Sequence, residues 1–136
     1  MVSLPTVLVI DDDLCIRKML CEILNLEGYP TITAEDGQEG LEILWKTEKP
    51  LVALLGYMMP NMLGTETLRY LAEDPVRARR HAIVLVSGHW NFPEMAAEVF
   101  PYALLPFIKK PFTAKQLLRA VEQATKRLYR EGLNRV

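Results

Sequence analysis

Short apolar runs alternate along the chain with longer segments in which apolar residues recur every three or four positions. The short runs are rich in Val, Ile and Leu and end at charged or turn residues, which is typical of buried strands. The spacing in the longer segments predicts amphipathic helices. The predicted strands cover residues 6–10, 31–34, 51–55, 82–86 and 104–108, and the predicted helices cover residues 14–27, 37–49, 65–72, about two turns within 93–101, and 113–130.

Strand and helix alternate five times, so the sequence predicts an α/β fold with one parallel sheet, helices on both faces and right-handed crossovers. Strands that are apolar throughout fit this class, because a parallel sheet is covered on both sides. Pro106 cannot donate a ladder hydrogen bond, which favours an edge position for the last strand. Residues 73–80 are expected to form a polar connection.

The ends of two predicted helices carry recognisable signals. Asp13 is expected to cap the first helix through its carboxylate, and Gly28 to end it. Thr113 and Gln116 have the spacing of a capping box at the start of the last helix.

Composition narrows the class of protein. The chain has 136 residues, half of them hydrophobic, which suits one domain with a sizeable core. No apolar run reaches the roughly 20 residues of a membrane span, and no signal peptide is visible, so we expect a cytoplasmic protein without membrane contact. The net charge is −1, but residues 109–136 carry +6 and the remainder −7. We interpret the basic end as a solvated helix face, and Cys15 and Cys21 as reduced thiols.

Polar residues follow several of the predicted strands. Because the carboxyl ends of parallel strands meet at one edge of a sheet, these residues are expected to form a pocket there. Paired carboxylates could hold Mg²⁺, which prefers oxygen ligands, while a hydroxyl and an ammonium could hold phosphoryl oxygens. The residues that follow the strands are Asp11 and Asp12, Gly56, Ser87 and Lys110.

Four sequence pieces, taken in order, resemble the receiver domain of two-component response regulators of the chemotaxis-regulator type. They are Val9–Asp13 with Ile16-Arg17, Met59-Pro60 with Gly64, Ser87-Gly88, and Lys110-Pro111-Phe112. The resemblance covers about residues 5–130. It implies a single flavodoxin-like, doubly wound domain over residues 1–136, with residues 131–136 a tail or the start of a linker. It also implies a five-stranded parallel sheet in the order 2-1-3-4-5 with five helices.

The resemblance also implies roles for individual residues. Asp11 and Asp12 would be the acidic pair, with Asp12 and the backbone carbonyl of Met58 as Mg²⁺ ligands. Ser87 would be the switch hydroxyl, Lys110 the lysine of the phosphate pocket and Phe107 the aromatic switch residue. The Lys110–Pro111 peptide bond is expected to be cis, which an X–Pro bond permits at small cost.

The chain departs from the family pattern at the position that matters most for phosphotransfer. Counting back from Met59-Pro60, the phosphoacceptor aspartate should stand at position 56, which is Gly56. Glycine supplies no carboxylate, so there is no catalytic residue at this position and the usual acyl phosphate is not expected. Mg²⁺ binding should be weakened by the missing carboxylate, and Lys110 is expected to pair with Asp11 or Asp12 instead.

Three functions remain open from the sequence. The first is a degenerate receiver, not an enzyme, that acts in a phosphorelay by protein contacts. The second is a phosphorylatable receiver whose aspartate was mutated or replaced by a neighbouring acid such as Asp12. The third is a small α/β ligand binder or enzyme.

The resemblance also implies partners. These are a histidine kinase, a phosphotransfer protein or an output domain, with nucleic acid reached only through an output domain. A homodimer could form through the face made by the fourth helix, the last strand and the last helix.

His81 and His89 are expected to be surface residues, because neither has a second metal ligand at suitable spacing.

Overall fold

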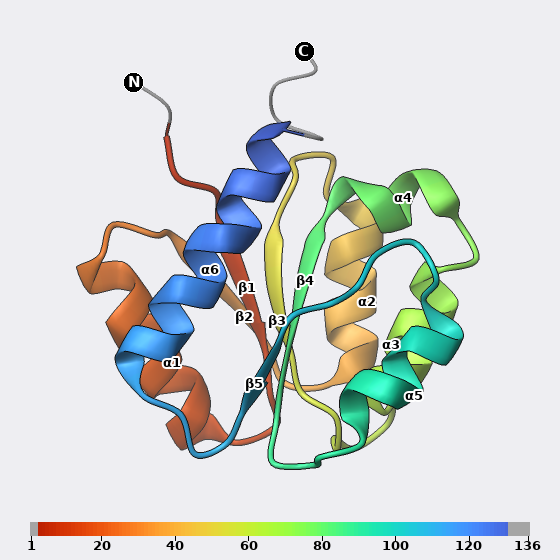
Figure 1. Ribbon diagram of the computed structural model, residues 1–136, viewed down its shortest axis with the longest axis horizontal. Coiled ribbons are helices and arrows are strands. Elements are labelled where there is room, and N and C mark those ends of the chain that lie inside the picture. Colours follow the sequence, from red (N-terminus) through yellow and green to blue (C-terminus); the bar gives the residue numbers. More distant parts are fainter. Residues whose placement is uncertain (1–2, 131–136) are drawn as a thin grey trace.

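Five parallel strands form the centre of the molecule, in the order β2-β1-β3-β4-β5. The computed structural model describes residues 3–130, and Figure 1 shows the strands running side by side between helices. The strands are β1 (Val7–Ile10), β2 (Thr31–Ala34), β3 (Val52–Leu55), β4 (Ala82–Ser87) and β5 (Phe107–Lys109). The helices are α1 (Leu14–Leu26), α2 (Gly37–Lys46), α3 (Gly64–Leu71), α4 (Pro75–Arg80), α5 (Phe92–Val99) and α6 (Ala114–Leu128). The predicted fold class and strand order are therefore confirmed.

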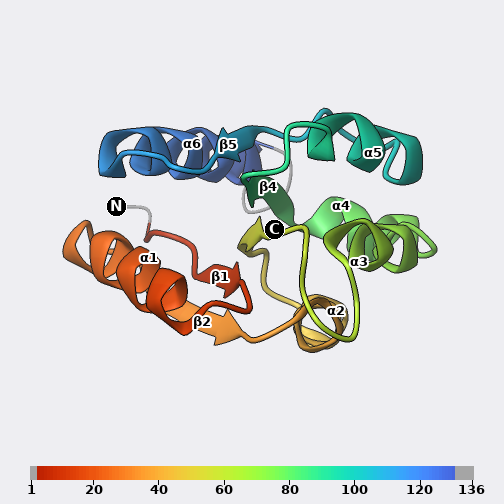
Figure 2. The same ribbon diagram turned by 90° about the horizontal axis from the view of Figure 1, so that it is seen from below.

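The helices cover both faces of the sheet, as the view from below shows (Figure 2). Alternate residues along each strand point to opposite faces. Val7 and Val9 pack with α1 and α6, whereas Leu8 and Ile10 pack with α2, α3 and α5. All the residues of β1, β3 and β4 are buried. This double burial explains why the sequence shows continuous apolar runs and no alternation.

Within residues 3–130 the structure has six helices, where the sequence predicted five. The additional helix is α4, in the segment expected to be a polar connection. Asp74 caps it by accepting hydrogen bonds from the backbone N–H groups of Val76 (3.1 Å) and Arg77 (3.2 Å), and Pro75 occupies its first turn. An N-cap aspartate followed by proline is a recognised signal for the start of a helix, so the start of α4 could have been predicted from the sequence.

His81 lies in the core, and its expected surface position was wrong. The residue is 5% exposed, and Nδ1 of its ring accepts a hydrogen bond from the backbone N–H of Leu51 at 3.0 Å. Nε2 therefore carries the proton and donates to the carbonyl of Leu44 at 2.8 Å. Burial lowers the pKa of His81 to about 4, against an opposing effect of its bond to Leu44. The neutral imidazole thus ties the end of α2 to the start of β3.

β5 lies at the edge of the sheet, as Pro106 predicted, but it is shorter than expected. Of residues 104–106, Pro106 only accepts a hydrogen bond at its carbonyl, from the backbone N–H of Leu85 in β4 at 2.8 Å, and Leu104 is 91% exposed. The capping box of Thr113 and Gln116 is confirmed, with bonds of 2.9 and 3.1 Å. No helix among residues 3–130 has the length and apolar composition that a membrane span requires.

Candidate functional site

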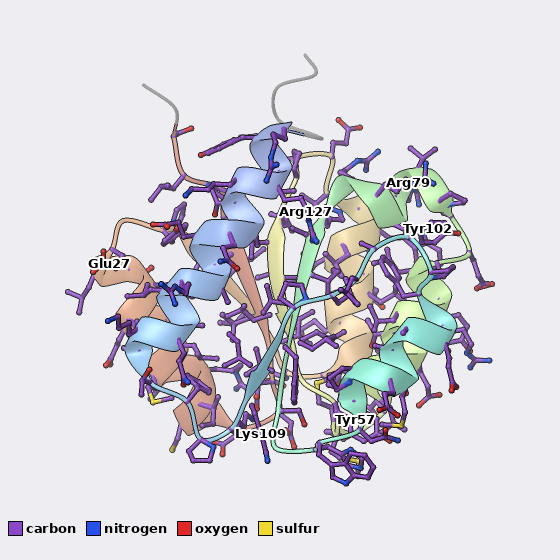
Figure 3. The ribbon with its side chains drawn as sticks, in the orientation of Figure 1. Glu27, Tyr57, Arg79, Tyr102, Lys109 and Arg127 are labelled. Carbon is purple, nitrogen blue, oxygen red and sulfur yellow. The ribbon has the colours of Figure 1, made fainter. Side chains whose placement is uncertain are left out.

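The carboxyl ends of β1, β3, β4 and β5 meet at one edge of the sheet. Asp11 follows β1, Gly56 follows β3, Ser87 ends β4 and Lys110 follows β5. Figure 3 shows this edge near Tyr57 and Lys109, at the bottom of the view. The parallel topology therefore brings together residues up to 99 positions apart.

Asp11 is the most completely partnered group of the site. Its side chain is 5% exposed, with Oδ2 2.9 Å from the ammonium Nζ of Lys110 and Oδ1 accepting from the backbone N–H of Asp13 at 2.9 Å. The buried Arg17 donates from Nη1 to the Asp11 carbonyl at 2.7 Å and lies 3.9 Å from the Glu35 carboxylate. The expected pairing of Lys110 is thus confirmed, with Asp11 as its partner.

The next two acids have different surroundings. Asp13 caps α1, accepting from the backbone N–H groups of Cys15 (2.8 Å) and Ile16 (3.3 Å), as predicted. Asp12 is exposed, and its side chain makes no hydrogen bond or ion pair within residues 3–130. Of the two carboxylates expected at the rim, one is therefore neutralised by lysine and the other is free to solvent.

Gly56 lies beside Asp11, and Gly64 packs closely against its backbone. A Cβ at position 56 would stand 3.7 Å from Asp11 Oδ2, 3.7 Å from the sulfur of Met59 and 3.3 Å from the carbonyl of Ile10. Gly64 covers the backbone here, because a Cβ on Gly64 would lie 2.2 Å from the Gly56 carbonyl oxygen. Only glycine at position 64 allows this close approach.

The loop between β3 and α3 is held by polar contacts at its tip. Asn61 has a positive φ of 68° and donates from Nδ2 to Asp36 at 2.7 Å. Asp36 also caps α2 by accepting from the backbone N–H of Glu39. That backbone hydrogen bond, followed by the one from Asn61, lowers the pKa of Asp36. The loop that carries Met58 and Met59 is thereby anchored to α2.

Ser87 is buried at the end of β4 and accepts a hydrogen bond at Oγ from the backbone N–H of His89 at 3.0 Å. Its carbonyl accepts from the backbone N–H of Lys110 at 3.0 Å. The Lys110–Pro111 peptide bond is cis, and Phe107 is half-buried against the core. The structure therefore brings Ser87 and Lys110 to the same rim as Asp11.

Aromatic side chains beside Gly56 were not singled out from the sequence. Tyr57 contacts the edge of His89 at 4.8 Å between ring centroids and lies 5.0 Å from Phe92. His89 stacks at 6.5 Å on Trp90, which is 72% exposed. Met58 is also exposed, so the rim carries apolar surface as well as carboxylates. Their scattered positions in the sequence gave no periodic signal.

The rim has only some of the oxygen ligands that a hard cation such as Mg²⁺ prefers. The exposed Asp12 could supply a carboxylate oxygen, but both carboxylate oxygens of Asp11 already have partners. No group of three or more His, Cys, Asp or Glu residues that could hold a metal ion occurs within residues 3–130. Mg²⁺ can be held by one or two carboxylates with waters, so the site has the minimum for it.

Comparisons with known proteins agree with this geometry. The chain is 31% identical over 117 residues to the sporulation initiation phosphotransferase F of Bacillus subtilis (strain 168), covering 86% of this chain and 90% of that protein. It is 32% identical over 131 residues to the probable transcriptional regulator ycf27 of Porphyridium aerugineum. That match covers 94% of this chain and 51% of the relative, so the chain spans about half the length of that protein.

A solved structure gives the same result. The receiver domain protein (CheY-like) from Methanospirillum hungatei JF-1 superimposes with a TM-score of 0.81 at 27% sequence identity, covering 96% of this chain and 100% of the other. The family model described as the response regulator receiver domain matches residues 7–122. The chain therefore belongs to the response regulator receiver domain family, whose members are signalling modules of two-component systems.

Proposed function

We propose that this chain is a degenerate receiver domain that acts through protein contacts without phosphorylation at position 56. Gly56 carries the proposal. It lies at the carboxyl end of β3 beside Asp11, which is where the resemblance puts the phosphoacceptor aspartate. An acyl phosphate needs a carboxylate oxygen, and glycine has no side chain to supply one.

Asp11, Ser87 and Lys110 lie at the same edge of the sheet, which supports this proposal. Lys110 and Ser87 would be the groups that hold phosphoryl oxygens, and Phe107 the aromatic switch residue. In this chain Lys110 is engaged by Asp11 at 2.9 Å. Because no modified side chain competes for the lysine, the balance between conformations must be set by the sequence or by a bound partner.

Weak Mg²⁺ binding belongs to the same proposal. Asp12 and the Met58 carbonyl would be direct ligands, with Asp11 contributing only when Mg²⁺ competes with Lys110 for its carboxylate. The bound ion would supply positive charge at the rim. With no carboxylate at position 56, the affinity of this site for Mg²⁺ should be lower than that of a receiver with three acids there.

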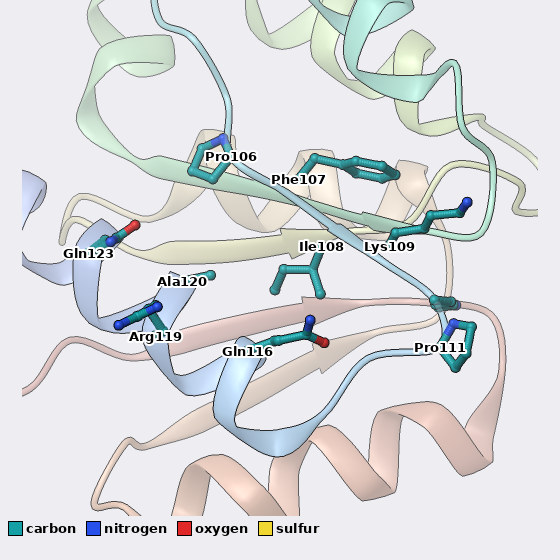
Figure 4. Close-up of a pocket in the computed structure, with 10 residues that line it drawn as sticks. Pro106, Phe107, Ile108, Lys109, Pro111, Gln116, Arg119, Ala120 and Gln123 are labelled. Carbon is teal, nitrogen blue, oxygen red and sulfur yellow. The ribbon is translucent and has the colours of Figure 1, made fainter.

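The partner surface we propose is the face of α5, β5 and α6, the helix 4–strand 5–helix 5 face of the family. A groove of about 600 Å³ follows β5 and α6 there, lined by apolar Pro106 and Ile108 and basic Arg119 (Figure 4). Exposed Leu104 adds apolar surface beside it. A histidine kinase, a phosphotransfer protein, an output domain or a second copy of the chain would dock on this face. Nucleic acid would be contacted only through an output domain.

One observation favours the alternative of a phosphorylatable receiver. Asp12 is an exposed and unpartnered carboxylate on the same rim. However, Asp12 is one residue further from the end of β1 than Asp11, and the ammonium of Lys110 pairs with Asp11. Phosphorylation at Asp12 is therefore the second candidate.

Backbone amide spectra of the wild type and of Gly56→Asp test the proposal. Each protein is compared with Mg²⁺ alone and with Mg²⁺ plus a small phosphodonor. We expect the signals of Ser87, Phe107 and Lys110 to stay unchanged in the wild type and to shift in Gly56→Asp. Donor-dependent shifts of these signals in the wild type would contradict a degenerate receiver.

A further inference from the structure

Within residues 3–130, β5 forms one edge of the sheet and pairs only with β4. The carbonyl of Pro106 accepts a hydrogen bond from the backbone N–H of Leu85 at 2.8 Å, and the backbone N–H of Lys110 donates to the carbonyl of Ser87 at 3.0 Å. In a parallel ladder, the backbone groups of alternate residues point to the same side of the strand. The backbone groups of Ile108, which lies midway between Pro106 and Lys110, therefore also point toward β4.

The backbone groups of the other two residues of β5 point away from the sheet. These residues are Phe107 and Lys109, and their N–H and C=O groups form no hydrogen bond within residues 3–130. An edge strand with free N–H and C=O groups is a template for one more strand. Pro106 does not block this edge, because its nitrogen, which has no proton to donate, is on the side of β4.

The groove beside this edge is positively charged. Its volume is about 600 Å³, residues 106–111 line one wall, and α6 lines the other. Among the described residues that line it, none is Asp or Glu. Figure 4 shows Lys109 on one side of β5 and Arg119 of α6 on the other. Both are exposed, and neither side chain forms a hydrogen bond or ion pair within residues 3–130. The two charges therefore lie near the two faces that an added strand would have.

Building on the partner surface of the proposed function, we propose that the edge of β5 binds an extended, acidic segment of a partner protein as a sixth strand. Main-chain hydrogen bonds with Phe107 and Lys109 would hold the segment, and acidic side chains on its two faces would meet Lys109 and Arg119. A second copy of the chain fits less well. Pairing β5 with β5 would bring Lys109 near its own copy, and like charges opposite each other destabilise a strand pair.

Backbone amide hydrogen exchange with a synthetic peptide tests the strand addition. The probe is a capped peptide of sequence Thr-Val-Glu-Asp-Val-Thr, whose two central acids point to opposite faces when it is extended. In the free chain, the amides of Phe107 and Lys109 should exchange fast and that of Ile108 slowly, because only Ile108 donates to β4. Saturating peptide should slow exchange at Phe107 and Lys109 by about fivefold or more. Binding without slower exchange at these two amides would overturn the proposal.

Two control peptides separate backbone pairing from charge attraction. The same peptide with every backbone nitrogen methylated keeps both acids but has no N–H donor, and it should not bind. A basic peptide, Thr-Val-Lys-Lys-Val-Thr, keeps the donors but has the wrong charge, and it should not bind either. Equal binding of the acidic probe and of either control would contradict the addition of an acidic strand.

Arg119→Gln should weaken peptide binding about threefold, measured from the amide signals as peptide is added at constant ionic strength, because one charge contact is lost. Lys115→Gln is the matched control. Lys115 is an exposed cation on the same helix that does not line the groove, so its loss should change the affinity by less than about 1.5-fold. Equal weakening by the two variants would remove Arg119 from the site and overturn the proposed charge match. Thermal melting confirms that each variant is folded.

The remaining outcomes distinguish this inference from the proposed function. Absence of peptide binding would overturn the strand addition alone, since no phosphodonor is present in this experiment. Phosphorylation of the wild type would overturn the degenerate receiver alone. Self-association that slows exchange at Phe107 and Lys109 without any peptide would assign the edge to a second copy of the chain, and would overturn the acidic segment.

Discussion

Lys110 and Asp11 are 99 positions apart in the sequence and form an ion pair with Nζ 2.9 Å from Oδ2. The Asp11 side chain is 5% exposed, whereas that of Lys110 is 30% exposed. The lysine thus neutralises a carboxylate that has little access to water. The pair joins the end of β1 to the end of β5 beside Gly56.

Replacing Lys110 by methionine should destabilise the fold. The change leaves a buried carboxylate without its counter-charge, and we expect a loss of about 1–3 kcal/mol in the free energy of unfolding at pH 7. Urea unfolding measures it. Lys109→Met is the control, because Lys109 is exposed and should matter by less than about 0.5 kcal/mol. Equal losses in the two variants would show that the ion pair contributes nothing specific.

His81 should make the stability of the domain dependent on pH. Its pKa is about 4 in the folded chain against 6.5 for an ordinary histidine, so the unfolded chain binds the proton more readily between these values. The free energy of unfolding is therefore not lowered by His81 above about pH 6.5. It falls as the pH decreases from there to about 4, by about 3 kcal/mol in all.

Urea unfolding at several pH values between 4 and 7.5 checks the His81 prediction. His81→Gln should flatten the profile in this window. His89→Gln should leave the profile as in the wild type, since His89 is exposed. A wild-type profile that is flat between pH 6.5 and 4.5 would rule out the neutral, buried imidazole.

Gly56→Asp should strengthen cation binding. A carboxylate at position 56 would join Asp11 and Asp12 at the rim, and a third acid attracts a divalent cation more strongly. We expect Mg²⁺ affinity to rise by roughly tenfold or more, measured by the quenching or shift of Trp90 fluorescence or by calorimetry. Gly56→Asn has nearly the same shape without the charge and should gain little. Equal Mg²⁺ affinity in the wild type and Gly56→Asp would contradict the weakened site.

Gly64 should tolerate no side chain. An added Cβ would lie 2.2 Å from the Gly56 carbonyl oxygen and 2.8 Å from the Phe92 ring, so the loop after β3 must move. Gly64→Ala should cost about 2 kcal/mol or more in the free energy of unfolding. In Gly88→Ala the added Cβ would meet only the Lys110 side chain, at 4.0 Å, and little change is expected. A similar cost in both variants would count against the close packing over position 56.

Much of the fold follows from periodicity, because strands buried on both faces and amphipathic helices leave clear patterns. The bounds of β2 and the capping roles of Asp13 and Thr113 were predicted from local residues alone. Helix α4 was missed because its arginine-rich sequence has little apolar periodicity, although Asp74 and Pro75 signal its start. The strand predicted for residues 104–108 was too long, since apolar composition does not show which residues find a ladder partner.

The site was predictable to the extent that topology brings strand ends together. The pairing of Lys110 with an acid followed from that convergence, but the choice of Asp11 over Asp12 depends on burial, which one sequence does not reveal. The burial of His81 was missed for a similar reason, since its two partners are backbone groups of Leu44 and Leu51. The aromatic contacts of Tyr57 with His89 join separate loops and leave no mark in local spacing.

The central claim is that this domain accepts no phosphoryl group, because position 56 has no side-chain oxygen to carry one. Incubation with a small phosphodonor and Mg²⁺, followed by the mass of the intact protein, tests it directly. We expect no gain in the wild type and a gain of one phosphoryl group in Gly56→Asp. A stoichiometric gain in the wild type, abolished by Asp12→Asn, would contradict the claim and assign the acceptor to the neighbouring acid.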